Sequence, residues 1–253
     1  MHHAAFAIRK VPQIGALFWI IKVLSTGMGE VTSDYLVRTI NPVLAVALGG
    51  AAFAAALVLQ LWVRRYIPWI YWLAVVMVAV FGTMVADVLH VRFGVPYLVT
   101  TALFSTALAV VFVAWYVSEK TLSIHTIYAG RREAFYWATV IATFALGTAV
   151  GDLTAITWHL GFFSAGLLFA GLIAIPAVAY AAFKLNAILT FWVAYVLTRP
   201  LGATFADWIG RPRSLSGLGL GTGVVSLVLT MMILVLVGYL TVTGQEAVPL
   251  GSA

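Results

Sequence analysis

The chain has 253 residues, of which 63% are hydrophobic and only 9% are charged, with a net charge of +6. Soluble domains carry roughly a quarter of charged residues, so this composition excludes a soluble globular protein and indicates a polytopic membrane protein. The absence of cysteine excludes disulfides, thiolate metal sites and a cysteine nucleophile. The N-terminal segment Met1 to Pro12 lacks a cleavable-signal pattern and is expected to be mature sequence.

Eight apolar stretches follow one another along the chain, and each is long enough to cross a bilayer as a helix. They cover residues 14–36, 42–63, 68–90, 95–117, 135–156, 160–183, 186–208 and 217–243. We therefore predict an all-α integral membrane fold with eight transmembrane helices in one membrane domain, 1–253. The linker at 118–133 is longer than the others and divides the chain into two halves.

A fourfold repeat organises these stretches, because every aspartate lies fifteen residues after a tryptophan and a glycine lies ten residues after the same tryptophan. The repeated sets are Trp19, Gly29 and Asp34; Trp72, Gly82 and Asp87; Trp137, Gly147 and Asp152; and Trp192, Gly202 and Asp207. A fixed period of this kind indicates internal duplication. Each unit holds two spans, so the four copies are parallel repeats, at about 13–64, 67–118, 133–184 and 186–243.

The repeated residues suggest simple structural roles. The tryptophans, each preceded by Phe or Tyr, are interpreted as interface anchors and packing residues. The glycines allow either close helix packing or a local helix break, and the sequence does not separate these two interpretations.

Four tandem two-span units, each with its tryptophan, resemble a bacterial membrane-protein repeat family described as a repeat of unknown function. The segments Phe18-Trp19 to Asp34, Phe135-Tyr136-Trp137 to Asp152 and Phe191-Trp192 to Asp207 carry the resemblance. The resemblance implies an eight-span bacterial inner-membrane protein, and it implies no particular activity.

The positions of lysine and arginine predict the orientation in the membrane. One side holds Arg9, Lys10, Arg64, Arg65, Lys120, Arg131, Arg132 and Lys184, and the other holds Arg38, Arg92, Arg211 and Arg213. This bias places both termini in the cytoplasm. It also accounts for the basic net charge without a nucleic-acid partner, which we exclude.

Residues three, seven, eleven and fifteen positions after each tryptophan share one helix face, because an α-helix turns by about 100° per residue. On the first span this stripe is Lys22, Thr26, Glu30 and Asp34, and on the seventh it is Tyr195, Arg199, Ala203 and Asp207. A charge that faces lipid costs about 2.5–3.5 kcal/mol or more, so we expect the stripes to face the bundle interior.

The acidic side chains are the candidate metal ligands: Asp34, Asp87, Asp152, Asp207 and Glu30. Oxygen ligands without thiolates suit a hard divalent cation or protons, and Mn²⁺ is the first candidate. Thr26, Thr83, Thr148 and His90 are possible accessory ligands. The alternative is a structural role, in which arginine tethers the aspartate, since Arg38 and Arg211 lie four residues after Asp34 and Asp207.

Lys22, Glu30 and Arg199 are the other charges deep within spans, and they break the repeat symmetry. We hypothesise that Glu30 pairs with Arg199 or with Lys22 across the first and seventh helices, and that this pair changes during transport. A static ion pair between the helices is the alternative.

These observations predict an ion-coupled transporter of a hard divalent cation, with lipid, the cation and protons as partners and no cofactor other than a bound cation. One alternative is a proton-coupled exporter of a small organic solute. A second is a membrane-embedded enzyme or signalling partner, although no Ser–His–Asp arrangement or histidine cluster suggests catalysis. The oligomeric state is left open.

Overall fold

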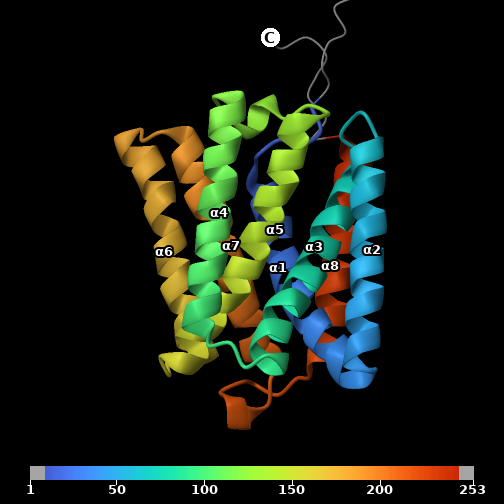
Figure 1. Cartoon of the computed structure of the whole chain (residues 1–253), viewed down its shortest axis with the longest axis vertical. Helices are drawn as coiled ribbons and strands as arrows, with labels where there is room; N and C mark the ends of the chain where they lie inside the picture. The colour runs from blue at the N-terminus through green and yellow to red at the C-terminus, as the bar shows by residue number, and fades with distance from the viewer. Residues whose placement is uncertain (1–8, 245–253) are drawn as a thin grey trace, which may run out of the picture.

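The computed structural model describes residues 9–244, which form eight long α-helices without any β-strand in that range (Figure 1). The predicted eight-helix fold is thus confirmed, while residues 1–8 of the N-terminal segment lie outside the described residues. The helices are α1 (Ala16–Thr39), α2 (Pro42–Trp62), α3 (Pro68–Asp87), α4 (Tyr97–Glu119), α5 (Arg131–Asp152), α6 (Gly161–Phe183), α7 (Ala187–Gly210) and α8 (Thr222–Thr243).

Several helix boundaries differ from the predicted spans by a few residues. α8 begins at Thr222 rather than at 217, because Gly219 and Gly221 take positive φ angles in the preceding turn. α3 and α5 continue beyond their aspartates as the π-helical turns η1 (Val88–Arg92) and η3 (Leu153–Thr157). Isolated π-helical turns often mark functional positions in helices.

Seven of the eight helices, α2 to α8, are long and apolar enough to cross a membrane. The chain is therefore a multi-pass membrane protein. The remaining helix, α1, carries Lys22, Glu30, Asp34 and Arg38, and it packs against α3, α7 and α8. The surrounding helices bury Lys22, Glu30 and Asp34, whereas the side chain of Arg38 is exposed.

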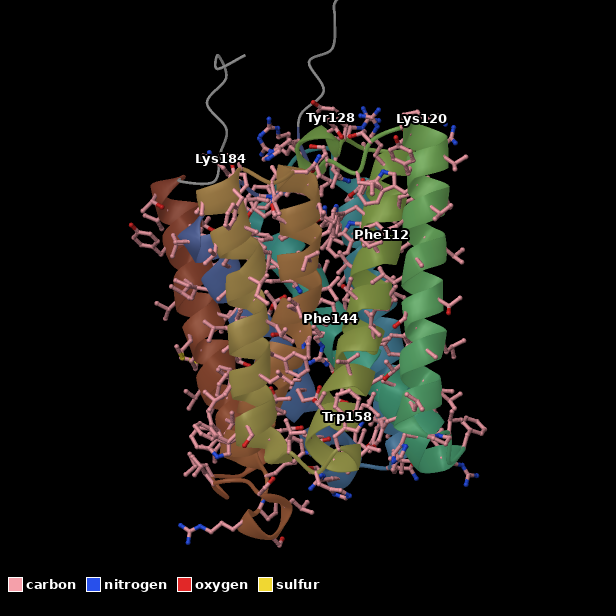
Figure 2. All side chains as sticks on the ribbon, turned by 90° about the vertical axis from the view of Figure 1, so that its left-hand side faces the viewer. Phe112, Lys120, Tyr128, Phe144, Trp158 and Lys184 are labelled. Atoms are coloured by element: carbon pink, nitrogen blue, oxygen red, sulfur yellow. The ribbon has the colours of Figure 1, made fainter. Side chains whose placement is uncertain are left out.

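The odd-numbered helices form a closed inner ring in the order α1, α3, α5, α7, because each packs on the next and α7 packs on α1. The even-numbered helices lie outside: α2 packs on α3, α4 on α5, α6 on α7 and α8 on α1 (Figure 1). Lys120 and Lys184 lie at one end of the bundle and Trp158 at the other (Figure 2). This arrangement has fourfold pseudosymmetry about the axis of the inner ring.

The repeat glycines create the close contacts of the inner ring. Each lies against the residue seven positions after the tryptophan of the next inner helix: Gly29 on Ala79, Gly82 on Phe144, Gly147 on Arg199 and Gly202 on Thr26. A β-carbon added at Gly82 would lie 3.0 Å from Cβ of Phe144, and the other three glycines leave less room. The helices continue through these positions, so close packing is the right interpretation and a helix break is wrong.

An aromatic layer repeats the same cyclic contact at the N-terminal end of the ring. The residue before each tryptophan contacts the tryptophan of the next helix: Phe18 with Trp72, Tyr71 with Trp137, Tyr136 with Trp192 and Phe191 with Trp19. Trp72, Trp137 and Trp192 are buried. The role as interface anchors is therefore wrong for these three, and the packing role is confirmed.

Candidate functional site

The inward-facing stripes predicted from the helical period line the axis of the inner ring. The residues three, seven and eleven positions after the tryptophans are all buried: Lys22, Thr26 and Glu30; Val75, Ala79 and Thr83; Val140, Phe144 and Thr148; Tyr195, Arg199 and Ala203. The apolar surroundings make the charged members the candidate site.

A buried ion pair between α1 and α7 lies at the centre of this axis. Nη2 of Arg199 lies 2.8 Å from Oε2 of Glu30, and their side chains are 0% and 1% exposed. The sequence hypothesis left two partners for Glu30, and the structure pairs it with Arg199. A charge-assisted hydrogen bond of this kind is stronger than one between neutral groups.

Threonines from the other helices complete the shell around Arg199. Its guanidinium donates to the hydroxyl of Thr148 at 2.7 Å, to the hydroxyl of Thr83 and to the carbonyl oxygen of Thr26 at 3.2 Å. The hydroxyl of Thr83 also donates to Glu30 at 3.3 Å. All four inner helices thus contribute to one polar layer, and the three threonines proposed as accessory ligands bind arginine here.

Lys22 lies outside this ion pair. Its Nζ has no hydrogen-bond partner among the described residues, although it is buried. It contacts the ring faces of Phe144 at 4.0 Å and Tyr195 at 4.2 Å from the ring centroids. The axis therefore carries two basic side chains, Lys22 and Arg199, and one carboxylate within this region.

Two of the four aspartates are held by arginines. Asp34 lies 3.2 Å from Arg38 and 3.3 Å from Arg211, and Arg211 lies 2.9 Å from Asp207. Burial alone lowers the pKa of Arg211, but the nearby carboxylates, chiefly Asp207 and then Asp34, raise the pKa above its ordinary value. Arg211 therefore stays charged and joins α1 to α7 at this end of the ring.

The other two aspartates, Asp87 and Asp152, form no ion pair within the described part of the chain. Asp152 is buried, Asp87 is half-buried, and each ends an α-helix that continues as a π-helical turn. The two carboxylates interact electrostatically with each other and with Glu30. The aspartates without an ion-pair partner in the described chain therefore lie on the α3 and α5 side.

His90 does not join this group, although it lies one helical turn after Asp87. Its ring stacks on Tyr97 with centroids 3.6 Å apart, and its Nδ1 lies 3.0 Å from the carbonyl oxygen of Val95. Across residues 9–244, no three histidine, aspartate or glutamate side chains form a group able to hold a metal ion. The predicted cation site stays a prediction.

A second buried ion pair at the N-terminal end of the ring was missed by the sequence analysis. Nζ of Lys10 lies 2.6 Å from Oε2 of Glu133 and donates to the carbonyl oxygen of Gln60 at 2.8 Å. Gln60 in turn donates to Glu133 at 3.3 Å. The sequence predicts only that Lys10 lies with other basic residues on one side of the membrane. The signal for a buried partner is Gln60, an isolated amide in the last turn of an apolar span. The N-terminal segment is thereby anchored across α2 and α5.

Comparison with known proteins gives a family and no activity. No curated protein and no solved structure matches the chain. The sequence pattern of one family matches four times in tandem, at residues 17–66, 70–121, 135–186 and 190–246, so that most of each of the eight helices is covered. The four matches coincide with the predicted repeats, and the chain belongs to the family described as Repeat of Unknown Function (DUF347).

Proposed function

We propose that this protein is an ion-coupled transporter of the bacterial inner membrane, with both termini in the cytoplasm. The observation that carries the proposal is the Glu30–Arg199 pair, fully buried at the centre of a membrane-spanning ring. Ionisable side chains within a membrane protein usually mark ion or proton pathways. A buried ion pair with only a structural role would add little to protein stability, because apolar residues of similar volume often stabilise a protein equally well.

Glu30 is the exchangeable acid in this proposal. Binding of a proton or a cation at Glu30 weakens its attraction to Arg199, whose guanidinium keeps hydrogen bonds to Thr83, Thr148 and Thr26. The contact between α1 and α7 then loosens, and the ring opens on one side. Loss of the ion restores the pair and closes the ring.

Asp87 and Asp152 form the entrance for the ion. Their carboxylates lack an arginine partner in the described chain, whereas Arg211 neutralises Asp34 and Asp207. The proposed cargo is a hard divalent cation such as Mn²⁺, exchanged for protons, because carboxylate and hydroxyl oxygens are the ligands such cations prefer.

The positive charge of Arg199 on the axis favours a carrier over an open channel. Arg199 repels a cation that follows the axis of the ring, and this repulsion is strong in a low-dielectric interior. Passage therefore requires the ion pair to rearrange in each transport cycle.

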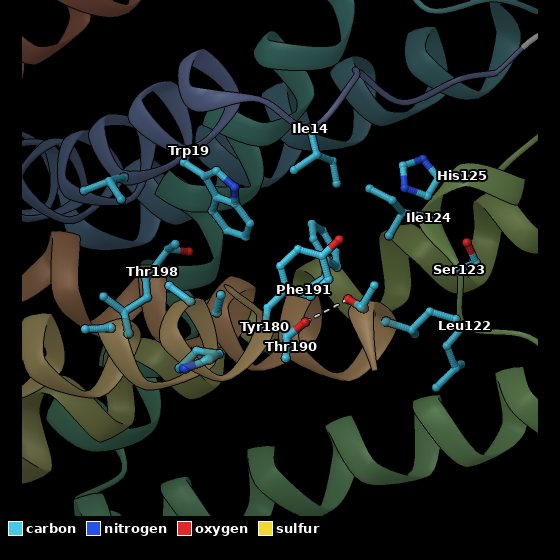
Figure 3. Close-up of a pocket in the computed structure, with 18 residues that line it drawn as sticks. Ile14, Trp19, Leu122, Ser123, Ile124, His125, Tyr180, Thr190, Phe191 and Thr198 are labelled. Carbon is cyan, nitrogen blue, oxygen red and sulfur yellow. Dashed lines mark hydrogen bonds between the residues drawn. The ribbon is translucent and has the colours of Figure 1, made fainter. Parts of the chain in front are cut away.

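A second candidate is a proton-coupled exporter of a small organic solute. It is favoured by a cavity of about 680 Å³ between α1, α6 and α7, with an aromatic and apolar lining (Figure 3). In that case Glu30 and the aspartates carry only protons.

The test uses purified protein in proteoliposomes that contain a pH-sensitive dye, with a panel of divalent cations outside. We expect the parent to take up at least one cation with a coupled pH change, and Glu30→Gln to abolish both signals. Glu119→Gln is the matched control, because Glu119 pairs with Arg131 and Arg132 outside the ring. Absence of uptake of every cation by the parent, or full activity of Glu30→Gln, overturns the proposal.

A further inference from the structure

The cavity between α1, α6 and α7 has the size of a small-molecule site. Its volume of about 680 Å³ falls within the range of roughly 300–1,000 Å³ that is typical of ligand pockets. α1 and α7 form its inner wall, α6 its outer wall, and residues 122–125 of the linker between α4 and α5 close one end (Figure 3).

The lining is mostly apolar, with Ser123 and His125 at the linker and the hydroxyl groups of Tyr180, Thr190 and Thr198 elsewhere. Trp19, Tyr180 and Phe191 supply aromatic rings, and none of the described residues that line the cavity is Asp, Glu, Lys or Arg. Ser123 and His125 lie together at the linker end, and Thr198 lies at the opposite end (Figure 3). The hydroxyl of Thr198 donates to the carbonyl oxygen of Tyr195, so this end offers little polarity to a ligand.

His125 presents a neutral ring to the cavity. Burial, and then the positive charge of Arg9, lower the pKa of His125 below its ordinary value near neutrality. A neutral imidazole offers one N–H donor and one nitrogen acceptor. The linker end therefore suits a hydroxyl or carbonyl group, and it does not attract a carboxylate as a charged imidazolium would.

The wall of the cavity at the fourth repeat differs from the equivalent positions of the other repeats. The residue two positions after the tryptophan is buried in the first three repeats, as Ile21, Ala74 and Thr139. The equivalent Ala194 is only half-buried and lines the cavity. Pro176 of α6 also lines it, and a proline inside a helix removes one backbone hydrogen bond. The opening is thus a departure from the fourfold packing.

We propose that this cavity binds an uncharged, ring-containing lipophilic compound with one hydroxyl or carbonyl group. The aromatic rings of the cavity pack against the ring system of the ligand, and Ser123 and His125 bind its polar group. The absence of ionised side chains in the lining excludes a charged ligand on energetic grounds. Ring lipids dissolved in the membrane and free lipophilic compounds both have this combination of a ring system and one polar group. Binding at this site is tested separately from the proposed ion transport, because the transport experiment contains no organic ligand.

The binding experiment uses the full chain in lipid nanodiscs and equilibrium dialysis with 2-naphthol as the probe, with empty nanodiscs to subtract partition into lipid. We expect saturable binding of one probe per chain. Naphthalene, which lacks the hydroxyl, and the charged 2-naphthoate should each bind about tenfold more weakly, the change that accompanies loss of about one good polar contact. Equal binding of all three probes overturns the assignment of the polar end.

Two tryptophan variants place the probe in the cavity. Ala177→Trp fills the cavity and should weaken binding of 2-naphthol by at least about tenfold. Val113→Trp is the matched control. Val113 lies seven residues before the left-handed Lys120 that follows α4, just as Ala177 lies seven residues before the left-handed Lys184 that follows α6, and Val113 is 63% exposed. His125→Phe keeps a ring and should lower affinity for 2-naphthol while leaving naphthalene unchanged. The proposal is overturned if no variant changes the binding of 2-naphthol. It is also overturned if the bound 2-naphthol only replaces bilayer phospholipid to the same extent in every variant.

Discussion

The first and fourth repeats differ from the second and third in the ion pairs that they form. α1 and α7 supply the charges, with Glu30 paired to Arg199 and Asp34 joined to Asp207 through Arg211. α3 and α5 supply threonine hydroxyls to Arg199 and carry aspartates without an ion pair in the described chain. The backbone scaffold is repeated four times, but the chemistry has separated into a charged seam and a hydroxyl-lined half. Because the ion pairs join α1 to α7, we expect the movement of the transport cycle to occur between these two helices.

The largest expected effect comes from breaking the seam. Arg199→Ala leaves Glu30 buried without its cationic partner, and removal of one member of a buried pair costs about 3–5 kcal/mol. We expect a clear loss of thermal stability in detergent micelles. The double variant Glu30→Gln/Arg199→Leu removes both charges and should recover most of the loss. If the single variant melts like the parent, the seam does not hold α1 and α7 together.

A glycine of the ring tests the packing that all four repeats share. A β-carbon at Gly29 collides with the backbone of Ala79 on α3, which cannot move aside like a flexible side chain. Overpacking of this kind costs about 1–3 kcal/mol, so Gly29→Ala should lower the unfolding temperature. Gly171→Ala on α6 is the control, because a β-carbon there meets no atom within 4 Å. Equal stability of the two variants would contradict the closed ring.

The sequence predicted this much of the site because the repeat fixes the helical position of each residue. Spacings of three, seven, eleven and fifteen residues place Lys22, Glu30 and Arg199 on inward faces, and the structure buries all three. The order of the ring and the partner of each stripe depend on tertiary packing, which periodicity does not encode. Glu30 therefore had two candidate partners in the sequence and has one ion-pair partner in the structure, Arg199.

The remaining features depend on departures from the repeat. The ion pair of Lys10 with Glu133 joins residues 123 positions apart, at a point where no motif recurs. Ala194 lines the cavity and is half-buried, whereas the alanine at the equivalent position of the second repeat, Ala74, is buried. Sequence patterns predict what the copies share, and differences among the copies require coordinates.

A pair of aspartate variants sharpens the comparison between the two halves. Asp152→Asn removes a buried carboxylate without an ion-pair partner in the described chain, and we expect it to slow ion uptake by about tenfold, a barrier of roughly 1.4 kcal/mol. Asp34→Asn removes a carboxylate that already has two arginine partners, so uptake should change much less. Proteoliposome uptake at matched protein density measures both. Equal losses would mean that the four aspartates act alike, and the division into two halves would be wrong.

The smallest expected effect separates the two arginines that contact Asp34. The side chain of Arg38 is 52% exposed and that of Arg211 is 14% exposed, although their distances to the carboxylate, 3.2 and 3.3 Å, are nearly equal. Exposed pairs contribute about 0–1 kcal/mol because water screens them, so Arg38→Ala should leave the unfolding temperature almost unchanged. Arg211→Ala should lower it further, since it leaves Asp207 buried without its partner and separates α1 from α7. If Arg38→Ala is the more damaging variant, Asp34 is held within its own helix, and the charged seam between the first and fourth repeats ends at Glu30.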